Sequence, residues 1–79
     1  GRRMLDYIYR LMRDFEQEHG FNPNLLYLNQ SHGEHIKLSF DETFTLQQIV
    51  EILGMEVVID REIIHPRVAW THYAYRIAS

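Results

Sequence analysis

The chain has 79 residues, of which 46% are hydrophobic and 24% charged, and this length and balance predict one small folded domain rather than a disordered segment. It contains no cysteine, which excludes disulfides and thiolate metal sites and favours a reducing, cytoplasmic setting. The net charge of −3 without clustered Lys and Arg argues against nucleic-acid binding, and no apolar run is long enough to span a membrane.

We treat residues 1–79 as a single domain. Residues 1–3 precede Met4, and we interpret them as an expression remnant or a disordered start. From Met4 onward, apolar residues recur at the three- and four-residue spacing of a helix that buries one face. Gly20 stands where a left-handed C-cap residue is expected, so this helix should end at His19. Its apolar positions are Met4, Ile8, Leu11, Met12 and Phe15.

A short strand is predicted over Leu25 to Leu28, after a turn at Pro23. Asn29 or Ser31 then caps a short helix through Lys37, although Gly33 weakens the helical tendency there.

The segment from Leu38 to Phe44 is predicted to be a loop that turns the rings of Phe40 and Phe44 inward. A second main helix begins at Thr45, which forms a capping box with Gln48. Phe44 and Ile49 stand at the positions of a hydrophobic staple. Gly54 ends this helix. Its apolar face consists of Leu46, Ile49, Val50 and Leu53.

Two further strands complete the prediction, one from Met55 to Ile59 and one from Val68 to about Tyr75. The fold class is therefore α+β, with a small three-stranded mixed sheet and two main helices in the order α-β-α(short)-α-β-β. The helical crossover should make the first two strands parallel if they are neighbours, and the third strand should return antiparallel beside one of them.

The predicted strands raise the question of what covers the sheet. The first two are apolar on both faces, and the third alternates Trp70 with Thr71 and Tyr73, but two main helices normally pack on one face only. Either the helices divide between the faces or another chain covers the second face. We therefore expect a small protein-interaction or self-associating module, paired with itself as a homodimer or with another protein. The expected interface residues are Tyr27, Trp70, Tyr73 and Tyr75.

Histidine spacing supports an alternative function. His32 and His35 lie three residues apart, so on a helix both could bind one metal ion, and His65 or His72 could supply a third nitrogen. This alternative is a histidine-centred metal-binding protein or small metalloenzyme. A solvated histidine pair without function explains the same spacing. No other cofactor is expected.

The remaining sequence does not favour an enzyme. The acidic residues at 41–42 and 60–62 are typical of loop solvation and of a turn after a strand. No glycine-rich phosphate loop, nucleophile elbow or catalytic cysteine is present. We therefore predict no catalytic residues.

Residues 23–59 carry one resemblance to a known family. The segment from Pro23 to Asn29, a helical stretch and the segment from Leu53 to Ile59 together resemble the axial-domain strand-helix-strand of phage-type shell proteins. The similarity covers under half of the chain, and the other shell-protein domains are missing. It implies a free-standing relative of an assembly module, not capsid assembly itself.

Overall fold

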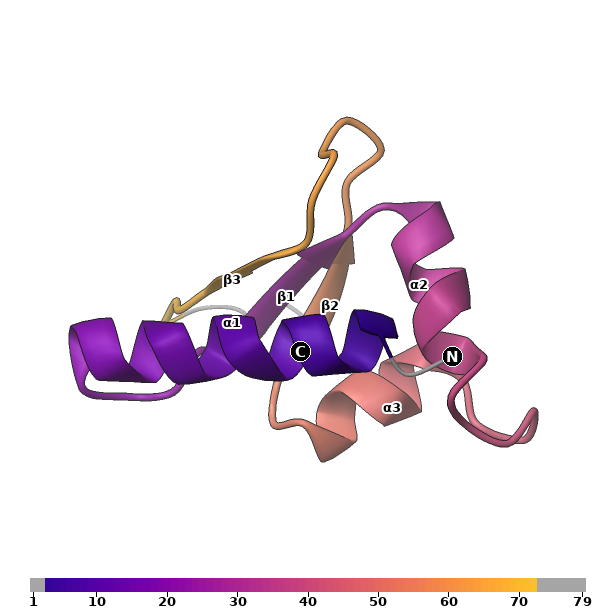
Figure 1. Ribbon diagram of the computed structural model, residues 1–79, viewed down its shortest axis with the longest axis horizontal. Helices are drawn as coiled ribbons and strands as arrows, with labels where there is room; N and C mark the ends of the chain where they lie inside the picture. Colours follow the sequence, from indigo (N-terminus) through magenta and orange to yellow (C-terminus); the bar gives the residue numbers. More distant parts are fainter. Residues whose placement is uncertain (1–2, 73–79) are drawn as a thin grey trace.

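The computed structural model describes residues 3–72, and its six elements confirm the predicted α+β class and element order (Figure 1). The sheet has the strand order β2-β1-β3. Strand β1 pairs parallel with β2 and antiparallel with β3, as predicted. The elements are α1 (Arg3–His19), β1 (Leu25–Leu28), α2 (Gln30–Lys37), α3 (Leu46–Ile52), β2 (Glu56–Ile59) and β3 (Arg67–Ala69).

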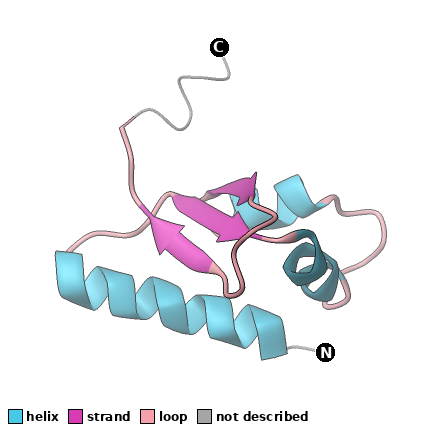
Figure 2. Ribbon diagram, turned by 90° about the horizontal axis from the view of Figure 1, so that it is seen from above, coloured by secondary structure: helices cyan, strands magenta, loops and turns pink. Residues whose placement is uncertain are grey.

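Helix α1 runs along the sheet as one long element (Figure 2). Its apolar stripe turns Leu5 and Ile8 into the interior, whereas the opposite side of the helix is charged and exposed. Gly20 ends the helix with φ +83°, and its N–H donates to the carbonyl of Glu16 at 2.8 Å. A residue with a Cβ rarely adopts this left-handed conformation, which explains the glycine.

Helix α2 contains a glycine that the sequence pattern marked as unfavourable. A Cβ built on Gly33 would lie 2.8 Å from Cδ2 of Leu46, which is closer than carbon atoms normally approach. The glycine therefore leaves room for the Leu46 side chain of α3 to pack on α2. Ile36, one turn later, is fully buried.

Helix α3 begins as predicted at Thr45, whose hydroxyl accepts from the N–H of Gln48 while the Gln48 side chain accepts from the N–H of Thr45. Ile49 and Val50 are fully buried, and Gly54 follows the helix with φ +85°. The predicted capping box and the glycine after the helix are therefore confirmed.

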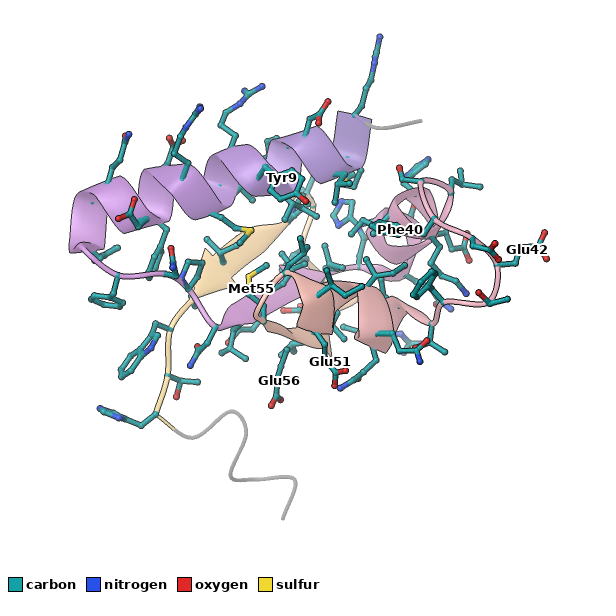
Figure 3. The ribbon with its side chains drawn as sticks, turned by 90° about the horizontal axis from the view of Figure 1, so that it is seen from below. Tyr9, Phe40, Glu42, Glu51, Met55 and Glu56 are labelled. Carbon is teal, nitrogen blue, oxygen red and sulfur yellow. The ribbon has the colours of Figure 1, made fainter. Side chains whose placement is uncertain are left out.

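All three helices bury their apolar residues against the same face of the sheet. The face is formed by Leu26 and Leu28 of β1, with Val57 of β2 and Val68 of β3 at its edges. Met55 lies between α1 and α3 (Figure 3). The helices therefore do not divide between the two faces. The buried cluster comprises Ile8, Leu26, Leu28, Ile36, Ile49, Val50 and Met55.

The last strand departs from the prediction within the described residues, because β3 ends at Ala69 and residues 70–72 are not strand. The rest of the predicted strand, residues 73–75, lies outside the described residues. If the register continued, Thr71 would face Pro23, which has no N–H to donate. The side chain of Asn24 takes over this pairing. Its Oδ1 accepts from the Thr71 N–H at 2.9 Å, and its Nδ2 donates to the Thr71 carbonyl at 2.7 Å.

The loop before α3 also departs from the prediction. Phe40 packs against the core, but Phe44 remains 37% exposed, so the prediction that both rings turn inward is wrong for Phe44. The two ring centroids lie 6.1 Å apart in an edge-to-face arrangement. Phe44 precedes the exposed cap of α3, and this position keeps its ring at the surface.

Candidate interaction surfaces

The second face of the sheet carries none of the core helices, and we call it the open face. The parallel register joins Leu25 to Glu56 and Tyr27 to Val58, and the antiparallel register joins Leu25 to Ala69 and Tyr27 to Arg67. Side chains on paired positions share a face, and they alternate with the core residues Leu26 and Leu28. Figure 3 shows Glu56 pointing away from α1. The open face consists of Leu25, Tyr27, Glu56, Val58, Arg67 and Ala69.

The open face is apolar along its centre and charged at two edges. Leu25 is buried, Tyr27 and Val58 are half-buried, and Arg67 is exposed. The guanidinium carbon of Arg67 lies 5.7 Å from the centre of the Tyr27 ring, within the range of a cation–π contact. By the strand register, Tyr27 lies on the face that carries none of the core helices. Its role as an interface residue stays a proposal.

A cluster of rings forms a second surface, which we call the ring cluster. Phe15 and His19 come from α1, Phe21 from the following turn, and Trp70 from the residue after β3. The rings of Phe21 and Trp70 meet edge to face with centroids 5.5 Å apart, and they remain 46% and 43% exposed. The members of the ring cluster are Phe15, His19, Phe21, Trp70 and His72.

The ring cluster has a structural role and leaves part of each large ring in water. It holds the end of α1 against the segment that follows β3, so part of the Trp70 side-chain surface is used in packing within the molecule. Exposed aromatic area of this kind is frequent at protein interfaces. Trp70 therefore lies where an interface residue could act. The other two predicted interface residues, Tyr73 and Tyr75, lie outside the described residues.

The predicted histidine pair occupies two different environments. His32 is only 8% exposed, and both of its ring nitrogens are hydrogen-bonded. The Asn29 N–H donates to Nδ1 at 3.1 Å, and Nε2 lies 3.0 Å from the Ile64 carbonyl. Since a carbonyl can only accept, Nε2 must carry the proton and the ring is neutral in this arrangement. A metal ion at His32 would have to break one of these bonds.

His35 is exposed and lines an open hollow of about 430 Å³ together with Arg3, Met4 and Leu38. This set contains no second histidine, no carboxylate and no nucleophile beside a base. Within residues 3–72, no group of three or more His, Asp or Glu side chains comes together as a metal site. Every buried side-chain nitrogen or oxygen in this range already has a partner. The metal hypothesis gains no support from these contacts.

Sequence reasoning missed several residues of the two surfaces. Glu56 and Arg67 were not singled out, although strand alternation with Tyr27 would have placed all three on one face once the register was known. Phe21 lay in a predicted turn, and its contact with Trp70 spans 49 positions of the chain. No local pattern indicates a contact of that range.

None of the helices within residues 3–72 combines the length and hydrophobicity needed to cross a membrane. No family model, curated protein or solved structure matches this chain. The resemblance of residues 23–59 to phage-type shell proteins therefore stays a prediction.

Proposed function

We propose that this chain is a small protein-interaction module that associates with itself or with another protein through the open face. The observation that carries the proposal is the one-sided packing of the helices. Leu26 and Leu28 are fully buried beneath all three helices, whereas on the opposite face Leu25 is buried but Tyr27 and Val58 are only half-buried. A sheet of three short strands gains stability when its second apolar strip is also removed from water.

The composition of the open face suits a protein partner. Tyr27 provides a broad ring at the centre, and Arg67 holds its charged group over that ring. Tyrosine and arginine are both enriched in the energetically important parts of interfaces. The ring cluster offers Trp70 and Phe21 as a second contact area at the end of α1.

The test is sedimentation equilibrium of the purified chain over a wide concentration range. We expect the weight-average mass to rise with concentration and Tyr27→Asp to suppress the rise, because a buried carboxylate without a partner opposes association. Ile52→Asp is the matched control, since Ile52 is 64% exposed on α3 and lies outside the open face. The same measurement on Trp70→Ala shows whether the ring cluster also contributes to association.

A partner of another kind would leave the purified chain monomeric. In that case, a photo-crosslinking amino acid at Tyr27 should capture the partner in cells, whereas one at Ile52 should not. A chain that stays monomeric and gives the same crosslinks from both positions contradicts the proposed function.

A further inference from the structure

The open face carries one acidic and one basic group on opposite edge strands. Glu56 begins β2 and Arg67 begins β3, and the residues between them on β1 are Leu25 and Tyr27. Neither charged group belongs to an ion pair among residues 3–72. The face is thus an apolar strip with an acid along one side and, along the other, a base whose described contact is with the Tyr27 ring. Such a strip is complementary to a copy of itself that has been turned over.

We infer that the open face is covered by a second copy of this chain, related by a two-fold axis that runs roughly along β1. This inference rests on the proposed association and specifies its partner and geometry. Rotation about such an axis exchanges the two edges, so β2 of one copy lies over β3 of the other. Glu56 then lies on the same edge as Arg67 of the partner subunit, two residues apart along the strands, and the symmetry repeats the pair.

The charges select this axis over the other simple arrangement. A two-fold axis perpendicular to the strands would place β2 over β2 and β3 over β3. Glu56 would then lie near Glu56 of the partner subunit, and the two arginines would also meet. Like charges brought together in this way oppose association. The axis along β1 brings opposite charges to the same edges of the interface and leaves Tyr27 to pack against Tyr27 of the partner subunit, while Val58 lies over β3 of the partner subunit.

The lengths of the side chains are compatible with this geometry. Glu56 is in register with Leu25 and Arg67 with Tyr27, so the two charges differ by two residues along the sheet, or about 7 Å. The long arginine side chain can span this offset. Three strands of three or four residues offer much less than the ~800 Å² that each partner contributes to a standard interface. The dimer is therefore weak and forms at high protein concentration.

The experiment reverses each charge separately and then mixes the products. We expect Glu56→Arg and Arg67→Glu each to raise the dimer dissociation constant at least ~10-fold, because each places like charges together twice. A 1:1 mixture of the two single variants should associate again, because every contact in the mixed dimer joins opposite charges. The double variant Glu56→Arg/Arg67→Glu should also recover. All samples are measured by sedimentation equilibrium at low ionic strength, where screening is weakest.

Matched controls carry the same charge changes elsewhere. Glu51 is exposed on α3 and Arg10 is exposed on α1, and the control variants are Glu51→Arg and Arg10→Glu. Both should associate like the unmodified chain. Far-UV circular dichroism of each variant confirms folding, and recovery in the mixture shows independently that both single variants are folded.

The outcomes separate this inference from the proposed function. A chain that associates equally well with either charge reversed overturns the two-fold arrangement but leaves an interaction module. Single variants that lose association without recovery in the mixture also overturn it. A chain that never self-associates overturns the inference, and the crosslinking experiment at Tyr27 then decides the proposed function.

Discussion

Helices α2 and α3 begin with the same local device, but the two capping boxes are tied to the rest of the molecule very differently. In α3, Thr45 and Gln48 bond to each other's backbone, and both are exposed. In α2, Asn29 and His32 do the same, but their side chains also reach the β2–β3 connection. Asn29 Nδ2 donates to the Ile63 carbonyl at 3.1 Å, and His32 Nε2 donates to that of Ile64 at 3.0 Å.

The comparison shows how one capping motif can serve two purposes. The α3 box satisfies backbone groups that the helix start leaves unpaired, and water could replace much of it. The α2 box is partly buried and joins a helix start to a connection more than thirty residues later. Its histidine therefore has a structural explanation that needs no metal ion.

The largest expected effect comes from removing the imidazole of the α2 box. His32→Ala leaves the Asn29 N–H and the Ile64 carbonyl without their partner, and we expect it to lower the free energy of unfolding by about 2–3 kcal/mol. His35→Ala, an exposed histidine on the same helix, should change it by less than about 0.5 kcal/mol. Urea denaturation followed by circular dichroism measures both.

A third variant divides the His32 effect into its parts. His32→Gln keeps an acceptor for the Asn29 N–H, as Gln48 does in α3, but it does not reproduce the position of Nε2. Its stability should lie between those of the chain and His32→Ala. If His32→Ala and His35→Ala lower the free energy of unfolding equally, the His32 side chain contributes no more to stability than an exposed surface histidine.

An intermediate effect is expected at the two N-cap residues. Thr45→Ala should lower the free energy of unfolding by about 1 kcal/mol, and Asn29→Ala by about 2 kcal/mol because it also removes the bond to Ile63. Asn29→Ser keeps a good N-cap oxygen and loses only the amide donor. It should therefore recover about half of the Asn29→Ala loss. If Asn29→Ala and Thr45→Ala prove equally destabilising, the Ile63 bond adds nothing.

The smallest perturbation requires no mutation. Because Nδ1 accepts from a backbone N–H and Nε2 donates to a carbonyl, His32 should exist as the neutral Nε2–H tautomer. Nitrogen-15 NMR of the histidine rings should show this single tautomer for His32 and rapid averaging for exposed His35. A His32 ring protonated at Nδ1 would contradict the bonding of the α2 box.

The predictability of each element follows the range of the interactions that define it. The α3 box was predicted because Thr45, Gln48 and Gly54 lie within ten residues of one another. The α2 box was foreseen only as a choice between Asn29 and Ser31. Histidine is not a usual residue at its third position, and the carbonyl that holds it is 32 residues away.

The candidate surfaces were predicted less completely than the fold. Tyr27 and Trp70 were expected at an interface, and the structure places one on the open face and the other in the ring cluster. Tyr27 and Trp70 lie on different surfaces because of the strand register, which the sequence alone does not give. The end of β3 at Ala69 depends on Pro23, which precedes β1, so the pattern of residues 68–72 alone could not show where the strand ends.

The amino-acid sequence by itself determined the element types, their order and the residues that start and stop the helices, because periodicity, capping and glycine conformation act over a few neighbouring residues. Only the tertiary structure decided that all three helices share one face, that Gly33 allows the approach of Leu46, and that Glu56 and Arg67 flank Tyr27. These features depend on contacts between distant segments, which form only when the chain is packed.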